Sequence, residues 1–280
     1  MEKKKYQRSA LFYLPVCALL ILLLSVPAGA ASGKKGWVTE GKYDYYYDAN
    51  GKKVSGLQKI KGRQYYFDKE SRRQYHGWAR IGNKYYCFDQ GRKSKGYMIT
   101  GKTVNGFKLG KDGAAVLNRK QKKASGLYKK KLKALVYASA YLFKESDPTM
   151  SREQKLRRMF DVTVSRYVFY VNWSPRTPAE FVLYMKNHQD IATDCTVAST
   201  IFGYFAAIIG YKHVYLVTTD NHTWTEIYSG GPKKYDINNG IFGEDTWGSA
   251  EKNYISLNSS RSEVKMEPGM KLYPRSYWET

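Results

Sequence analysis

A repeat of about 20 residues in the first half of the chain constrains the fold more than any other feature. Each unit begins with glycine and an apolar residue, and a cluster of aromatic residues ending in aspartate follows. The glycine pairs are Gly36-Trp37, Gly56-Leu57, Gly77-Trp78 and Gly96-Tyr97, and the aromatic clusters are Tyr45-Tyr46-Tyr47-Asp48, Tyr65-Tyr66-Phe67-Asp68 and Tyr85-Tyr86-Cys87-Phe88-Asp89. One hairpin cannot bury its own apolar face, so regular units at this period indicate a stacked array.

We therefore predict an all-β hairpin-repeat solenoid over residues 36–113. Each unit is expected to hold an aromatic strand, a turn such as Asp48-Ala49-Asn50-Gly51, and a return strand. The last unit fades at Gly106-Phe107-Lys108-Leu109.

The positive charge of the protein is concentrated in this repeat region. Residues 31–130 hold 25 Lys and Arg against 7 Asp and Glu, whereas residues 131–280 hold 18 against 16. Such asymmetry favours a polyanion as the partner of the front half. The alternative is that the lysines only keep a tyrosine-rich surface soluble.

The N-terminal segment has the pattern of an export signal. Basic residues at positions 3–8 precede an apolar run from Leu11 to Val26, and Ala28-Gly29-Ala30 supplies small residues for cleavage. We predict a signal peptide at 1–30, a secreted protein and no membrane contact after cleavage. An uncleaved anchor is the alternative, although the run is short for a membrane span.

The repeat units resemble the cell-wall-binding repeats of Gram-positive surface proteins, including the choline- and glucan-binding kinds. The resemblance implies a wall-associated protein whose aromatic side chains bind a cell-wall polymer or glycan. The implied binding residues are Trp37, Tyr46, Tyr47, Tyr65, Tyr66, Trp78, Tyr85 and Tyr86. Leu57 replaces the usual tryptophan, and the excess of cations counts against a cationic ligand such as choline. The aromatic residues could instead only hold the hairpins together.

The second half lacks the repeat and has the apolar spacing of helices and strands, and a basic linker at 114–130 is expected to separate it from the repeats. Apolar spacing predicts helices over 132–144 and 151–170, a third over 178–187, and a strongly apolar one from Cys195 to Ile209. Strands are expected over 213–219, 222–228 and 234–237. Helices followed by strands indicate an α+β domain over 131–280.

Three residues in this half form a candidate nucleophilic site. Cys195 begins the apolar helix, where the helix dipole and free amide groups favour a thiolate and an oxyanion. His222 starts a strand 27 residues later, and Asp236 follows 14 residues after that. A hairpin turning at residues 230–232 would place Asp236 beside His222, so that the carboxylate could orient the imidazole.

This order and spacing resemble the transglutaminase-like superfamily, which has a papain-like fold. The resemblance implies that Cys195 is the nucleophile, His222 the general base and acid, and Asp236 the orienting carboxylate. Trp224 and Glu226 match the residues that follow the family's histidine and are expected to support the site. Asp194, directly before the cysteine, is a departure that could raise the thiol pKa or hold a positive partner.

Several alternatives stay open for these residues. Cys195 could be structural or bridge to Cys87, and His213 and His188 are competing bases. Asp220, Asp245 and Glu226 are other candidates for the third member of the triad. A rival family is the NlpC/P60 wall peptidases, which also begin a helix at Asp-Cys but place the histidine further downstream.

The residues thus predict a wall-associated cysteine enzyme that acts on peptide or glutamine amide bonds through a thioester. Its substrate would be a peptide or protein, and a peptidase and a cross-linking acyltransferase share the same intermediate. We expect no cofactor, no metal and no specific nucleic-acid partner, because no matching motif is present. The alternative from another class is a catalytically silent wall-binding adhesin or structural protein.

Overall fold

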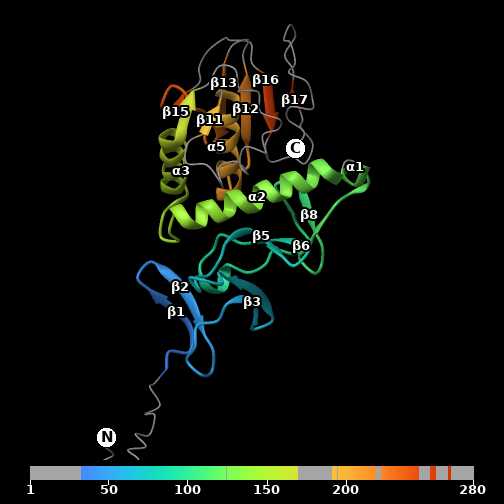
Figure 1. The fold of residues 1–280 in the computed structure, drawn as a ribbon, viewed down its shortest axis with the longest axis vertical. Coiled ribbons are helices and arrows are strands. Elements are labelled where there is room, and N and C mark those ends of the chain that lie inside the picture. The colour runs from blue at the N-terminus through green and yellow to red at the C-terminus, as the bar shows by residue number, and fades with distance from the viewer. Residues whose placement is uncertain are drawn as a thin grey trace, which may run out of the picture.

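The structure is a computed structural model that describes residues 33–123, 125–169, 191–193, 195–218, 222–245, 253–256 and 264–265. The predicted signal peptide and the predicted helix over 178–187 lie outside these ranges. Within them, no helix is long and apolar enough to cross a bilayer. The repeat array forms one end of the molecule, and the helices and the main sheet form the other (Figure 1).

The array begins with three two-stranded antiparallel hairpins. They are β1 (Gly36–Glu40) with β2 (Tyr43–Tyr47), β3 (Gly56–Ile60) with β4 (Arg63–Phe67), and β5 (Gly77–Ile81) with β6 (Lys84–Phe88). A three-stranded sheet of β7 (Thr103–Val104), β8 (Phe107–Leu109) and β9 (Ala115–Val116) completes it. Four small sheets over 36–116 agree with the predicted hairpin array.

The turn inside each hairpin differs from the expected one. Glu40 pairs with Tyr43, so a two-residue turn joins the glycine strand to the aromatic strand, and Gly41 there has a left-handed φ of 57°. The predicted turn follows the aromatic strand and leads only to an isolated bridge between Tyr47 and Lys53. Asp48 closes that second turn because its carboxylate accepts backbone N–H groups, including that of Asn50 at 2.9 Å.

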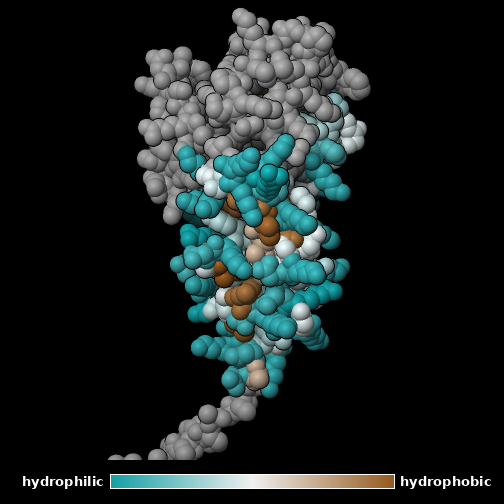
Figure 2. All heavy atoms as spheres, turned by 90° about the vertical axis from the view of Figure 1, so that its right-hand side faces the viewer, coloured by the Kyte–Doolittle hydropathy of each residue, from teal (hydrophilic) through white to brown (hydrophobic). Residues whose placement is uncertain are grey.

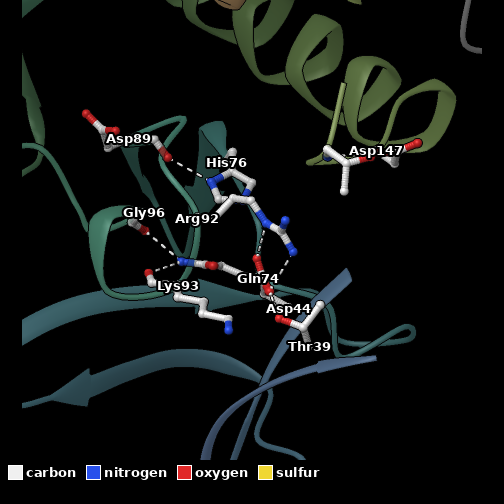
Figure 3. Close-up of polar contacts among 10 residues, drawn as sticks. Thr39, Asp44, Gln74, His76, Asp89, Arg92, Lys93, Gly96 and Asp147 are labelled. Carbon is white, nitrogen blue, oxygen red and sulfur yellow. Dashed lines mark hydrogen bonds and ion pairs between the residues drawn. The ribbon is translucent and has the colours of Figure 1, made fainter. Parts of the chain in front are cut away.

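Successive hairpins are joined by backbone and side-chain hydrogen bonds. The N–H of Gln74 donates to the carbonyl of Asp44 at 2.8 Å, and that of Met98 to Gln64 at 2.7 Å. Arg92 donates two hydrogen bonds, of 2.7 and 2.9 Å, to the buried Asp44 carboxylate and so links the third repeat to the first (Figure 3). Burial opposes the charge on Asp44, but the bonds from Arg92 and Thr39 hold its pKa below the usual value.

The expected linker over 114–130 is instead ordered. It contains β9, a short helix α1 (Arg119–Lys123) and the start of the long helix α2 (Ser125–Glu145). Asn118 and Gln121 exchange side-chain-to-backbone hydrogen bonds of 2.9 and 3.0 Å, which is a capping arrangement that starts α1. Apolar spacing missed this helix because nearly all of its residues are basic.

The second half is built from helices and one large sheet, as expected for an α+β domain. The helices are α2, α3 (Arg152–Arg166) and α5 (Cys195–Ile209), and a short parallel pair joins β10 (Tyr167–Phe169) to β11 (Ile191–Thr193). The antiparallel sheet has the order β15-β14-β13-β12-β16-β17. Its strands are β12 (Val214–Thr218), β13 (Thr223–Tyr228), β14 (Pro232–Asp236), β15 (Ile241–Asp245), β16 (Asn253–Ser256) and β17 (Val264–Lys265).

One hydrophobic core spans the array and the second half. Trp78, Phe107 and Leu109 from the array are fully buried in the same cluster as side chains of α2, α3 and α5. Helix α2 lies between the array and the sheet (Figure 1), and its Ser139 Oγ accepts the N–H of Trp78 at 2.9 Å. The later repeats are therefore packed into the second half as part of its core. The mixed α and β architecture is clear, and the papain-like assignment stays a prediction.

Candidate active site

The structure brings Cys195, His222 and Asp236 together from three elements. Cys195 is the first residue of α5, His222 directly precedes β13, and Asp236 is the last residue of β14. Strands β13 and β14 pair in antiparallel register, with Thr225 opposite Tyr235, so the hairpin brings Asp236 level with Trp224, two residues from His222 on the same face. The predicted hairpin geometry is present.

The first turn of α5 is tied to β13 by two buried hydrogen bonds. Ser199 Oγ donates to the carbonyl of Thr223 at 3.0 Å, and Thr225 Oγ1 donates to the carbonyl of Ser199 at 2.7 Å. Both bonds lie one turn along the helix from Cys195. They fix the position of the N-terminal end of α5 relative to β13, the strand that follows His222.

His222 is the central member of a hydrogen-bonded chain. Its Nε2 lies 2.7 Å from Oδ2 of Asp236, which is fully buried, and its side chain also hydrogen-bonds that of Cys195. These bonds, first to Asp236 and then to Cys195, raise the pKa of His222 to about 9. Burial would raise the pKa of Asp236, but the bonds from His222 and Asn239 lower it to about 2. Both groups are therefore charged at neutral pH.

The other residues expected near the site occupy different places. Trp224 and Glu226 are buried on β13, and the indole Nε1 donates to Glu226 Oε1 at 3.0 Å. The Trp224 ring centroid lies 6.0 Å from that of His222, so this pair supports the wall behind the imidazole. Asp194 lies outside the described residues.

Two residues that sequence reasoning missed hold Asp236. Asn239 Nδ2 donates to Asp236 Oδ2 at 2.9 Å, and its backbone N–H donates to Oδ1 at 3.2 Å. Lys234 Nζ lies 3.2 Å from the same Oδ2. The signals were present in the sequence, because alternate residues of a strand share a face and an asparagine after an aspartate often closes a turn.

The alternative candidates for the base and the carboxylate lie away from the Cys195–His222–Asp236 site wherever the structure describes them. His213 is exposed before β12, and Asp245 forms an ion pair with Lys233 at 2.8 Å. His188 and Asp220 lie outside the described residues. Cys87 is buried in β6, and both it and Cys195 are free thiols, so the structure contains no bridge between them. Among the described residues, no group of three or more His, Cys, Asp or Glu could hold a metal ion.

The predicted wall-binding aromatic residues are divided between the interior and the surface. Trp78 and Tyr65 are buried, with exposed fractions of 0% and 2%, which corrects their expected place on a binding surface. Their repeats stack on α2 and on neighbouring hairpins, so these positions fill cores. Trp37, Tyr46, Tyr66, Tyr85 and Tyr86 are partly buried against the same clusters, and Tyr47 is partly exposed.

Cations cover several aromatic faces of the array. Lys53 Nζ lies 3.7 Å from the Tyr45 ring centroid, and the Arg63 guanidinium carbon lies 4.4 Å from that of Tyr97. The face of the array in Figure 2 is mostly hydrophilic, with small apolar patches between the charged side chains. An arrangement of cations on ring faces is suited to anionic groups better than to a cationic ligand.

Comparisons with known proteins reach only a small part of the chain. No family model and no curated protein matches it. Choline-binding protein F of Streptococcus pneumoniae, solved with a peptidoglycan analogue, is 26% identical over 30% of this chain and 27% of its own, with a TM-score of 0.27. A second crystal form of that protein is 33% identical over 30% of this chain and 29% of its own, also with a TM-score of 0.27.

The Cpl-1 endolysin complexed with a peptidoglycan analogue is 23% identical over 29% of this chain and 24% of its own, with a TM-score of 0.21. The chain thus spans less than a third of each of these proteins. They are the type of protein that the repeats resemble, and none of the three is named as transglutaminase-like. At these TM-scores the likeness carries no argument about function.

Proposed function

We propose that this protein is an exported, wall-associated cysteine enzyme that cleaves or transfers amide bonds. The observation that supports the proposal is the hydrogen-bonded chain from Cys195 through His222 to the buried Asp236. A charged imidazole beside a cysteine stabilises a thiolate, which is the reactive form of the side chain. The same three residues would be costly to assemble in a merely structural role, because a buried carboxylate needs compensating partners.

The reaction follows from these positions. The thiolate of Cys195 attacks the amide carbonyl carbon, and the oxygen becomes an oxyanion that backbone N–H groups at the start of α5 can stabilise. The C–N bond then breaks, and His222 gives its proton to the departing amine. This leaves a thioester on Cys195 and a neutral imidazole.

The fate of the thioester decides the product. Water that passes its proton to His222 attacks the thioester, releases an acid and restores the charged pair, which is peptide hydrolysis. A lysine amine that attacks in place of water forms a cross-link. We favour hydrolysis of a wall peptide, as implied by the resemblance to bacterial members of the superfamily.

The array would hold the enzyme on its substrate. Its net charge and cation-covered rings favour an anionic wall polymer or an acidic glycan. Because the array shares a core with the second half, attachment would also fix the orientation of the active site relative to the wall.

A second candidate is a catalytically silent wall-binding protein. It is supported by the repeat array, whose cations cover aromatic rings and suit an anionic wall polymer without any reaction at Cys195. It predicts that Cys195→Ala changes thiol labelling and nothing else.

Thiol alkylation separates the two candidates. The secreted form is treated with iodoacetamide from pH 4 to 9, and the label is located by mass spectrometry, with His222→Ala beside it and His213→Ala as the matched control. Rapid labelling of Cys195 near pH 6 that is lost in His222→Ala and kept in His213→Ala supports the enzyme. Labelling only above about pH 8, the same in all three proteins, is the behaviour of an ordinary thiol and contradicts it. The buried Cys87 provides an internal reference for slow labelling.

A further inference from the structure

The oxygen Oδ2 of Asp236 is shared by three donors. His222 Nε2 lies 2.7 Å from it, Asn239 Nδ2 2.9 Å and Lys234 Nζ 3.2 Å. Two of these donors can carry a full positive charge. A single carboxylate therefore balances both an imidazolium and an ammonium group.

The position of Lys234 is fixed by the strand and by an aromatic ring. It lies on β14 two residues before Asp236, so both side chains are on the same face of the sheet. Its Nζ lies 4.6 Å from the centroid of Trp224, and its side chain is 23% exposed. A cation–π contact and an ion pair together hold the ammonium group at the carboxylate.

The neighbouring Lys233 provides a natural contrast. It has the same charge and lies on the same strand, but the alternation of the strand turns it to the other face. There it pairs with the exposed Asp245 at 2.8 Å. A charge effect that depends on contact with Asp236 should therefore belong to Lys234 alone.

Other charged groups around the imidazole do not replace this effect. Among the described residues, Cys195 from α5 and Asp236 and Lys234 from β14 face the site. Glu226 on β13 is the partner of Lys234 in the strand register; it is fully buried, and its carboxylate accepts the Trp224 indole N–H at 3.0 Å. Lys234 is thus the cation that competes with His222 for the carboxylate.

We propose that Lys234 is a positioning residue that acts through Asp236 to limit how tightly His222 holds its proton. With Asp236 alone, the imidazolium would be stabilised so strongly that it would release its proton reluctantly to a leaving amine. The ammonium group of Lys234 withdraws part of that stabilisation and keeps the carboxylate in place. This role has a purpose only under the proposed enzyme function, although its physical effect on His222 does not depend on activity.

The test is a titration of His222 by NMR in the full secreted chain labelled at histidine. Lys234→Met keeps the contact with Trp224 and removes the charge, and Lys233→Met is the matched control. We expect Lys234→Met to move the His222 titration upward by roughly one pH unit and Lys233→Met to leave it in place. Lys234→Gln, which keeps a donor without the charge, should shift it in the same direction and serves if the methionine variant does not fold.

Each other outcome overturns the proposal. A downward shift would mean that Lys234 only orders Asp236, and no shift would mean that its charge is screened. Equal shifts in Lys233→Met would mean a general effect of surface charge. Repeating the titration in Cys195→Ala separates this proposal from the enzyme proposal, because the competition for Asp236 persists without the thiol. A thiol that proves unreactive while His222 still responds to Lys234 would remove the enzyme function and keep the electrostatic effect.

Discussion

The first and third hairpins begin with the same glycine-tryptophan pair but use it differently. Trp37 packs edge-on against Tyr46 and Tyr65 inside the array and stays partly exposed. Trp78 is fully buried under α2, and its indole Nε1 donates to Asn105 Oδ1 at 2.8 Å. The repeat pattern specifies a hairpin, and the neighbour that packs on the hairpin decides whether its tryptophan belongs to an array surface or to a core.

The same difference separates the early repeats from the late ones. The first hairpin meets the second half at an ion pair between Lys42 and Asp147 at 3.2 Å and at Tyr43, which lines a pocket together with Phe143 of α2. The third hairpin shares a core with the second half, and the backbone N–H of Trp78 donates to Ser139 Oγ. The side chain of Gln90, just after this hairpin, donates to the carbonyl of Ile208 at 3.2 Å. A domain boundary at residue 113 therefore does not coincide with the boundary of the core.

The largest expected effect is from deleting repeats. Removal of residues 33–125 exposes the core side of α2 and should leave the second half unfolded by circular dichroism. Removal of residues 33–55 takes away the first hairpin alone and should leave a cooperative thermal transition while lowering retention on isolated cell walls. A folded, stable product of the longer deletion would contradict the shared core. Equal wall retention of the full chain and the shorter deletion would argue against a binding role of the first repeat.

Replacing Trp78 should lower the free energy of unfolding more than replacing Trp37. Trp78→Ala leaves a large cavity and removes the indole donor to Asn105 Oδ1, so we expect a loss of about 3–5 kcal/mol in the free energy of unfolding. Trp37 is partly exposed, so solvent can enter the space that Trp37→Ala leaves, and we expect a loss of about 1–2 kcal/mol. Urea unfolding of both variants measures the difference, and similar losses would mean that the array is as tightly packed as the shared core.

The glycines that start the hairpins give a finer comparison. Gly56 and Gly77 both have a left-handed φ, of 70° and 82°, so alanine is strained at each. A Cβ at Gly56 would meet nothing within 4 Å, but one at Gly77 would lie 2.7 Å from Ser139 Oγ. We expect Gly56→Ala to cost about 1 kcal/mol and Gly77→Ala about 2–3 kcal/mol. Chemical unfolding compares the two, and Gly77→Ala/Ser139→Ala should recover part of the larger loss.

The smallest expected effects concern two histidines, one in each region. His76 Nδ1 lies 2.8 Å from the carbonyl of Asp89, and burial lowers its pKa, whereas bonds to Asp236 and Cys195 raise the pKa of His222 to about 9. His76 therefore stabilises the fold above about pH 6.5 and loses this effect as pH falls. His222 stabilises it below about pH 6.5 and loses this effect as pH rises through 9.

Unfolding midpoints measured from pH 4 to 10 test these opposite signs. His76→Phe should flatten the acid side of the stability profile and leave the alkaline side unchanged. His222→Ala should flatten the fall between pH 6.5 and 9 and leave the acid side unchanged. A His222 variant with an unaltered alkaline fall would mean that the imidazole is not charged in the native protein.

The main elements of the second half could be predicted from local pattern. The apolar run starting at Cys195 predicts a helix to Ile209, and the structure contains α5 over the same residues, ending at Gly210 with a φ of 107°. The expected strands at 213–219, 222–228 and 234–237 correspond to β12, β13 and β14 within one or two residues. Such patterns are readable because burial of one face imposes a period on the chain.

Sequence spacing predicted that Cys195, His222 and Asp236 lie together, but it did not predict the residues that hold Asp236 in place. Asn239 and Lys234 have only the general signals of a turn asparagine and of strand alternation, and it was the folded hairpin that placed both at the Asp236 carboxylate. The catalytic role of the three residues is still a prediction, because geometry shows which groups meet and not which bond they break.

The sequence by itself determined the repeat period, the hairpins, the helix that begins at Cys195 and the order of the candidate triad. These depend on turn residues, apolar periodicity and spacing, which are local properties of the chain. Only the tertiary structure decided that Trp78 and Tyr65 are core residues, that the basic segment from Arg119 to Lys123 is helical, and that the late repeats belong to the second half. Those outcomes depend on which surfaces pack together, and the shared repeat pattern does not specify which unit a distant helix will cover.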